Sequence, residues 1–311
     1  MSRRLAILCP GQGAQHAQMF DVLGNGGPAA LLADEWRLRE ALGMPPEQAL
    51  NEASRLYANR SAQPLIVAAS LMAWEAVRNV LPMPSLVAGY SIGELTAYAV
   101  AESLAAQDAI ALAAIRATAM DACKEPGQPQ AMLAVSGIAL PLLREMLAPA
   151  AMSIAIETGE DSAVVGGLRQ DADAVRESVE QRGARVTALP VEVASHTPLM
   201  HAAVAPFLAE LRQRKFSNPH LPVVCGISAE NIRDKERAID TLARQLSETI
   251  VWQQCMDNFA EAGITIALEL GPGNALSRML SQRHPQIACR AACEFRSVAG
   301  VASWVGRHFG E

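Results

Sequence analysis

Short apolar runs that lead into glycine alternate along this chain with longer segments of helical periodicity. Each run is nearly all apolar, which is typical of parallel strands that are covered on both faces of a sheet. The clearest candidate strands are 5–9, 85–88, 221–225 and 265–270. Because strands followed by crossover helices define the α/β class, we predict an α/β fold. Between Ser91 and Met120 the Ala- and Leu-rich pattern predicts two successive helices, the second capped by Asp108.

A second, smaller unit follows a Pro/Gly/Gln cluster at residues 124–129, which is typical of a linker. The β-α-β-β-α-β order beyond this cluster predicts a ferredoxin-like α+β subdomain. Its strands are expected at 132–135, 153–157, 163–166 and 185–193, and its helices at 140–147 and 171–182. We therefore predict a catalytic core made of residues 1–127 and 194–311, with residues 128–193 inserted as the small subdomain.

Composition and charge narrow the class of protein. The chain has 311 residues, 50% of them hydrophobic, and a net charge of −6 from 26 basic and 32 acidic residues. It has no block of five or six Lys or Arg residues, so we expect no nucleic-acid partner. No apolar stretch approaches the ~18 residues of a membrane span. The first apolar run stops at Pro10, which is too early for a signal peptide, so we expect a cytoplasmic protein with no membrane contact.

Six cysteines are scattered without the paired spacing of a zinc site or a disulfide framework. We therefore expect buried, reduced thiols and no bound metal. The cysteines are Cys9, Cys123, Cys225, Cys255, Cys289 and Cys293.

The strongest local signal is the GxSxG pattern at residues 89–93, between a predicted strand and a predicted helix. On such a turn the serine backbone is strained and its hydroxyl is exposed, while the two glycines let strand and helix approach closely. The amide of Ile92, at the start of the helix, is placed to stabilise an oxyanion. We interpret Ser91 as a nucleophile, and the alternative is a structural tight turn.

A serine nucleophile needs a base, and the chain has six histidines. His196 follows the last predicted strand of the small unit and precedes Thr197-Pro198, at a junction where α/β enzymes keep catalytic groups. We favour His196 as the base for this reason. The other five are expected elsewhere: His16 and His201 beside turns or on helix surfaces, His220 and His284 in exposed segments, and His308 in a frayed carboxyl end.

Arg116 is the sole charge on a helix that is otherwise suited to burial. A buried guanidinium needs a carboxylate partner. That partner is either a structural Asp or Glu of the protein or the free carboxylate of a substrate held bidentately. In the second case the acyl group would be a half-ester or half-thioester of a dicarboxylic acid.

Seven separated motifs, taken together, resemble those of the malonyl-CoA:acyl-carrier-protein transacylases. They span nearly the whole chain in the order of the family. The resemblance implies an α/β-hydrolase-like core with an inserted ferredoxin-like subdomain, in agreement with the pattern above. The motifs are Gly11-Gln12-Gly13-Ala14-Gln15, Gln63-Pro64, residues 89–94, Arg116, Ser195-His196 with Leu199-Met200, Gln245-Leu246 with Trp252, and Glu269-Leu270-Gly271-Pro272-Gly273.

The resemblance implies a ping-pong transfer of a malonyl group from coenzyme A to the phosphopantetheine thiol of an acyl carrier protein, without a cofactor. Ser91 would form a malonyl-serine intermediate with His196 as general base. The remaining positions implied are the amides of Gln12 and Ile92 as the oxyanion hole, Arg116 for the malonyl carboxylate, Gln63 and Tyr90 in the acyl pocket, and the Gln245 carbonyl as the group that orients His196. The protein is expected to be a monomer. Arg283, Arg290 and Arg296 are candidates for a basic surface toward an acidic carrier protein.

Several positions depart from the family pattern. Tyr90 replaces the usual histidine before the serine, and Ile156 and Thr158 replace two asparagines. Ala194 stands where the usual proline precedes the Ser-His pair. These changes favour a specialised member, such as the malonyl transferase subunit of a malonate decarboxylase or an acyltransferase of a polyketide pathway.

Two other classes of function remain as alternatives. The first is a serine esterase or thioesterase that hydrolyses an acyl thioester on the same serine. The retained Arg116, and the lack of a convincing triad Asp between Ser91 and His196, weigh against it. The second is a carrier-protein docking module without catalysis, which the retained Ser91, His196 and Arg116 make less favourable.

Overall fold

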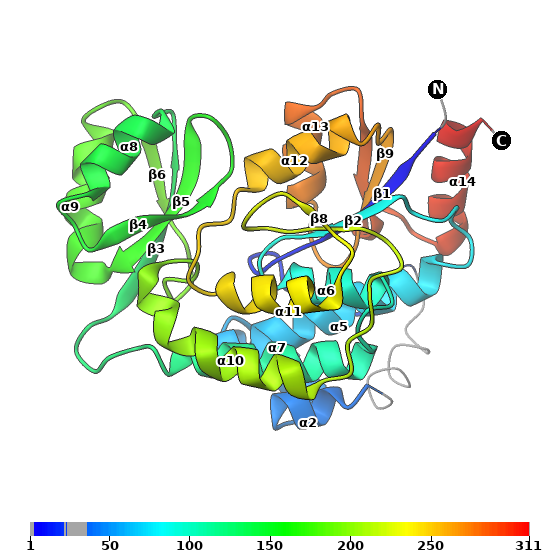
Figure 1. Cartoon of the computed structure of the whole chain (residues 1–311), viewed down its shortest axis with the longest axis horizontal. Helices are drawn as coiled ribbons and strands as arrows, with labels where there is room; N and C mark the ends of the chain where they lie inside the picture. The colour runs from blue at the N-terminus through cyan, green and yellow to red at the C-terminus, as the bar shows by residue number, and fades with distance from the viewer. Residues whose placement is uncertain (1–2, 22, 24–35, 311) are drawn as a thin grey trace.

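The computed structural model describes residues 3–21, 23 and 36–310, and its strands form two separate sheets (Figure 1). The larger sheet consists of β1 Leu5–Cys9, β2 Leu86–Gly89, β7 Val223–Val224, β8 Asn231–Ile232, β9 Ile266–Glu269 and β10 Ala288–Ala291. Its strand order is β10-β9-β1-β2-β7-β8. Pairing is parallel from β10 to β7, and the edge strand β8 is antiparallel to β7. This sheet, joined by crossover helices, confirms the predicted α/β class.

Helices cover both faces of the larger sheet. The long ones are α5 Asn59–Val77, α6 Gly93–Val100, α7 Ala106–Asp121, α10 His201–Gln213, α11 Lys235–Arg244, α12 Trp252–Glu261, α13 Ala275–Arg283 and α14 Val298–Phe309. Successive side chains of a strand point to opposite faces. In β1, Leu5 and Ile7 join a buried cluster with α5, α6, α7, α10, α11 and α14. Ala6 and Leu8 join a second cluster with α12 and α13, so the sheet is the middle of three layers.

Shorter helical segments lie in the same part of the chain. They are α2 Leu38–Leu42, α3 Pro46–Asn51, α4 Ala53–Leu56 and the 3-10 turns η2 Pro198–Met200 and η3 Ala292–Glu294. In the part of the chain that the structure describes, no helix is both long and apolar enough to cross a membrane.

The smaller sheet consists of β3 Gln130–Ser136, β4 Met152–Glu157, β5 Ser162–Leu168 and β6 Arg185–Ala188, with helices α8 Leu140–Leu147 and α9 Arg169–Glu180. Its order is β4-β5-β3-β6, with antiparallel pairing throughout. The helices enclose a separate apolar core on one face, on the outer side in Figure 1. The other face packs Met132, Ile156 and Val164 into the cluster of α12. The element order is β-α-β-β-α-β, while the boundaries at 127/128 and 193/194 stay predictions.

Two strands are shorter than the sequence predicts by three residues or more. The run 185–193 forms a strand only as far as Ala188, because Pro190 has no N–H to donate to a ladder. The chain then turns toward the larger sheet, and Leu189 and Val191 line the cavity described below. The run 221–225 pairs as a strand at Val223–Val224.

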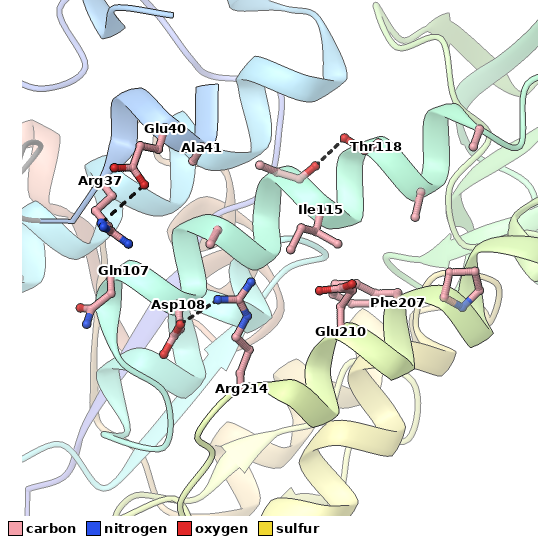
Figure 2. Close-up of a pocket in the computed structure, with 15 residues that line it drawn as sticks. Arg37, Glu40, Ala41, Gln107, Asp108, Ile115, Thr118, Phe207, Glu210 and Arg214 are labelled. Carbon is pink, nitrogen blue, oxygen red and sulfur yellow. Dashed lines mark hydrogen bonds and ion pairs between the residues drawn. The ribbon is translucent and has the colours of Figure 1, made fainter. Parts of the chain in front are cut away.

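The predicted cap at Asp108 is wrong. Helix α7 begins at Ala106, one turn earlier than the prediction, so Asp108 lies within its first turn, where a negative charge suits the helix dipole. Its carboxylate instead accepts from Nη1 of Arg214 at 3.2 Å, across the gap between α7 and the end of α10 (Figure 2). Asp108 therefore links α7 to the end of α10 through an ion pair and does not cap the start of α7.

The expectation of buried thiols holds for three of the six cysteines. Cys9, Cys225 and Cys255 are buried, whereas the Cys293 side chain is exposed next to Gly273. All six are free thiols.

We predict that Gly93→Ala strongly destabilises the protein. A Cβ atom at position 93 would lie 2.1 Å from the carbonyl oxygen of Cys9, so β1 and α6 would have to separate. Such overpacking costs on the order of 3 kcal/mol of unfolding free energy. Gly300→Ala in α14 is a matched control, because the atoms nearest to its Cβ lie at 3.6 Å. Chemical unfolding of both variants checks the prediction, and equal stabilities would contradict it.

Candidate active site

Ser91 lies on the turn between β2 and α6, in a backbone conformation that is rare for serine. Its φ is 54°, in the left-handed region. The turn closes because residues 89 and 93 have no side chains: a Cβ on Gly89 would lie 2.1 Å from the carbonyl carbon of Gly93. The strained, tightly packed turn lifts the hydroxyl out of the sheet and into a cavity.

His196 faces Ser91 from the loop that joins the small sheet to α10. Its Nε2 lies 2.7 Å from Ser91 Oγ. Its Nδ1 lies 2.5 Å from the backbone carbonyl oxygen of Gln245, so Nδ1 is the donor and Nε2 is the acceptor for the serine hydroxyl. The φ of His196 is also left-handed, at 61°, and its backbone N–H donates to the Leu246 carbonyl at 2.8 Å. The imidazole is therefore fixed from two sides in the tautomer that can take the serine proton.

Burial keeps this imidazole neutral. Desolvation, with a further contribution from the Arg116 guanidinium, lowers the pKa of His196 to about 3. Within the described residues, the group bonded to Nδ1 is a carbonyl and no carboxylate takes the third position of a hydrolase-like triad.

Arg116 is buried in α7 and reaches the reacting hydroxyl. Its Nη2 lies 3.3 Å from Ser91 Oγ and 3.3 Å from Oε1 of Gln245, and its Nη1 donates to Oε1 of Gln63 at 2.8 Å. Burial lowers the pKa of Arg116 to about 10, and the charge of Glu94 opposes this shift. The guanidinium therefore stays charged near neutral pH, although the oxygens it touches directly are all neutral.

Glu94 completes this group of side chains, although nothing in its sequence context predicts a role for it. Its Oε2 accepts from Nε2 of Gln245 at 2.5 Å and from the backbone N–H of Gly226 at 3.0 Å. Burial raises the pKa of Glu94 to about 7, and those two hydrogen bonds and the charge of Arg116 act in the opposite direction. A glutamate in the first turn of a helix is ordinary in sequence, so only its position in the fold distinguishes it.

A cavity of about 550 Å³ opens above Ser91 and His196, between the two sheets. It is mostly apolar, with Met132, Ile156 and Val164 contributed by the small sheet. A wider groove of about 1200 Å³ adjoins it along the small sheet, α12 and α13, and the two share Ala134, Val164, Arg278 and Met279. A third hollow of about 330 Å³ shares Gln12, Val191 and Ser195 with the cavity and runs toward Asn59 and Met120. Another hollow, lined by residues of α7 and α10, contains none of the predicted site residues (Figure 2).

The two amides predicted for the oxyanion hole are both available. Gln12 lines the cavity, and Ile92 directly follows Ser91. In the described part of the chain neither of these backbone N–H groups donates a hydrogen bond. Their proposed role stays a prediction.

The departures from the family pattern fall in different places. Tyr90 lines the cavity and packs edge-on against Trp252, with ring centroids 5.2 Å apart, and burial raises the pKa of its hydroxyl. Ile156 also lines the cavity, whereas Thr158 lines the wider groove. Ala194 is fully buried, and its N–H donates to Gln130 at 2.8 Å. Tyr90 and Ile156 are thus the two departures that touch the space beside the serine.

The remaining histidines do not approach Ser91. His16, His201 and His220 are exposed, as expected. His284, expected to be exposed, is instead half-buried, and its Nε2 lies 2.9 Å from Oδ1 of Asp257. His308 is not in a frayed end: it lies in the last turn of α14, and its Nδ1 bonds the Trp304 carbonyl oxygen at 2.8 Å. Among the described residues, no three His, Cys, Asp or Glu side chains gather as metal ligands would.

Comparison with known proteins places this chain among acyltransferases. Residues 7–301 match the acyl transferase domain family. A malonyl CoA-acyl carrier protein transacylase of Mycobacterium tuberculosis is 30% identical over 291 residues, which cover 92% of this chain and 95% of the relative. One from Salmonella typhimurium is 28% identical over 299 residues, covering 88% and 91% of the two chains.

Solved structures agree with the sequence comparison. The malonyl-CoA:acyl carrier protein transacylase of Xanthomonas oryzae superposes with a TM-score of 0.88 at 28% identity, over 99% of each chain. The transacylase of Coxiella burnetii superposes with a TM-score of 0.90 at 23% identity, over 99% of this chain and 98% of that one. This second match shows that the two chains share a fold. The fold and the matched domain define an acyltransferase. More narrowly, the chain belongs to the malonyl-CoA:acyl carrier protein transacylase family.

We predict that His196 remains neutral from pH 8 down to pH 5. Its pKa of about 3 lies below this range, so the neutral form persists, whereas an imidazole with the ordinary pKa of ~6.5 would become mostly charged at pH 5. The ¹⁵N shifts of labelled histidine report this directly, and His196→Gln assigns the signal. A neutral ring with protonated Nδ1 throughout is expected, and a titration midpoint near pH 6.5 would contradict the burial argument.

Proposed function

We propose that this protein transfers a malonyl group from coenzyme A to the phosphopantetheine thiol of an acyl carrier protein, through an ester on Ser91. The observation that carries the proposal is the meeting of two groups at one hydroxyl. Ser91 Oγ lies 2.7 Å from a neutral imidazole nitrogen and 3.3 Å from a buried guanidinium. The first is suited to take a proton, and the second is suited to hold a carboxylate.

In the first half-reaction, Ser91 Oγ attacks the thioester carbonyl carbon and its proton passes to Nε2 of His196. The amides of Gln12 and Ile92 receive the developing oxyanion. When the tetrahedral intermediate collapses, the carbon–sulfur bond breaks and the imidazolium returns its proton to the coenzyme A thiolate. The products are malonyl-Ser91 and free coenzyme A.

The second half-reaction is the same chemistry in reverse order. The carrier's thiol gives its proton to His196, its sulfur attacks the serine ester, and Ser91 Oγ leaves with that proton. The Gln245 carbonyl keeps Nδ1 protonated in both halves, which fixes the ring as Nε2 alternates between base and acid.

Arg116 gives the site a preference for an acyl group with a free carboxylate. Its direct partners are the neutral oxygens of Gln63, Gln245 and Ser91, so its direct contacts do not neutralise its charge. An acetyl group leaves that arrangement unchanged, whereas a malonyl carboxylate adds a charge-assisted pair. Tyr90 and Ile156 shape the cavity beside this pair and are the residues through which a specialised member would differ.

We assign the wider groove to the carrier protein, because it adjoins the cavity of Ser91 and shares four lining residues with it. Arg185, Arg278 and Arg283 line it and provide basic groups for an acidic partner. Arg283 is already bound to Asp257 at 2.6 and 2.8 Å, and Arg290 pairs with Glu294. Arg296 is exposed.

We also propose that the protein is a cytoplasmic, monomeric enzyme that needs no cofactor.

The proposal predicts a covalent malonyl-enzyme that a carrier protein discharges. Intact-protein mass spectrometry after mixing with malonyl-CoA should show one malonyl adduct on the wild type and none on Ser91→Ala. Adding a carrier protein that bears its phosphopantetheine arm should remove the adduct and load the carrier, while the same carrier without the arm should leave the adduct in place.

Other outcomes decide against the proposal. Discharge of the adduct to free malonate without any carrier would favour the esterase or thioesterase alternative. An adduct that persists on Ser91→Ala would place the nucleophile elsewhere. The absence of both an adduct and free coenzyme A would exclude malonyl-CoA as the donor.

A further inference from the structure

Glu94 and Arg116 are buried charges of opposite sign beside the reacting serine. Their exposed fractions are 1% and 2%. In the described part of the chain the other buried acid is Glu269, whose carboxylate accepts from the backbone N–H groups of Leu276 and Ser277 at the start of α13. Glu94 is therefore the acid that balances Arg116.

The two charges are joined through one side chain. The amide of Gln245 donates to Glu94 at 2.5 Å and accepts from Arg116 at 3.3 Å, while its backbone carbonyl holds His196. The backbone at Gly226 approaches the Glu94 carboxylate closely, because a Cβ atom at this position would lie 2.9 Å from Oε2 of Glu94. A side chain at position 226 would therefore crowd the carboxylate. The other carboxylate oxygen, Oε1, is buried and has no hydrogen-bond partner among the described groups.

Binding of a malonyl carboxylate upsets this balance. Without it, the charges of Arg116 and Glu94 cancel and His196 is neutral. With it, two carboxylates share one guanidinium in a buried site. Two negative charges that lie close together in a buried site repel each other, and this repulsion raises the pKa of one of the two acids. The substrate carboxylate contacts Arg116 directly, whereas Glu94 reaches it through Gln245, so Glu94 is the weaker partner.

We propose that Glu94 takes up one proton from solvent, on Oε1, when the carboxylate of the acyl donor pairs with Arg116. The inference rests on the proposed function and extends it: Glu94 is a positioning residue that holds Gln245 in both states and neutralises the extra charge in the loaded one. No covalent bond changes in this step.

The groups around Glu94 leave it as the one that titrates. Tyr98 of α6, Cys225 after β7 and Cys255 of α12 all face its charge, and burial raises the pKa of each, that of Cys225 to about 11. Arg116 keeps its proton and His196 stays without one near neutral pH. The pKa of Glu94 is about 7 without the donor, so Glu94 is mostly ionised at pH 8. A second negative charge in the site raises this pKa and so converts Glu94 to its neutral form.

Calorimetry with the full-length Ser91→Ala protein, which binds without turnover, tests the proposal. Malonyl-CoA and acetyl-CoA are titrated at pH 8 in buffers of low and high ionisation enthalpy, and the difference in binding enthalpy gives the protons taken up. We expect malonyl-CoA to take up about one proton more than acetyl-CoA. Because the bound pKa exceeds the free one, malonyl-CoA binding should weaken about tenfold per pH unit above pH 7.

Two further variants assign the proton. Glu94→Gln in the Ser91→Ala background keeps an oxygen for Gln245 and Gly226, and it should abolish the excess uptake. Glu269→Gln is the matched control, since it alters the other buried acid and should retain the uptake. Equal proton numbers for the two thioesters, uptake that survives Glu94→Gln, or pH-independent malonyl-CoA binding would each overturn the proposal.

Failure of this inference is distinguishable from failure of the proposed function. If the wild type forms the malonyl adduct but binding takes up no excess proton, the proposed role of Glu94 is wrong and the proposed function stands. If neither binding nor an adduct is found, both proposals are wrong.

Discussion

The buried guanidinium of Arg116 constrains everything around it. A cation in the interior is tolerated only when its charge is balanced and its N–H groups find acceptors. Here Gln63 and Gln245 supply acceptor oxygens and Glu94 supplies the opposite charge one side chain further away. Because the balancing acid does not touch the guanidinium, Arg116 stays open to a second carboxylate at the position where the serine reacts. The same cation, together with burial, keeps His196 neutral and so able to accept a proton.

Backbone strain at two positions fixes this geometry. Ser91 and His196 both have left-handed φ values, and they face each other from the β2–α6 turn and from the loop before α10. The serine turn is locked by the close packing of Gly89 and Gly93, and the histidine is locked by two hydrogen bonds to residues 245 and 246. A backbone carbonyl in place of the acid of a hydrolase triad leaves no third charge at the histidine. The acidic charge lies instead next to Arg116, to which Glu94 is linked through the side chain of Gln245.

Local patterns predicted the α/β class, the serine turn and the junction at which His196 lies, because each depends on neighbouring residues. Arg116 was also marked by a local pattern, as the sole charge on an apolar helix. The roles of Gln63 and Gln245 came from family resemblance alone, and the fold brings the three residues together from three helical segments. Glu94 could not be identified, since its partners lie 132 and 151 residues away in sequence. Strand ends were misjudged where proline interrupts pairing, as at Pro190, and Asp108 was taken for a cap because the alanine that precedes α7 carries no capping signal.

The central proposal for this site is that Arg116 selects an acyl group by its carboxylate. The most direct measurement is the rate at which malonyl-CoA and acetyl-CoA acylate Ser91, followed by rapid quench and mass spectrometry. Arg116→Ala is combined with Glu94→Gln, so that no acid is left unpaired, and Glu94→Gln alone is the control. We expect the control to keep its preference for malonyl-CoA, and the double variant to lose about a hundredfold or more of it. An unchanged preference in the double variant would show that another group recognises the carboxylate and would contradict the account.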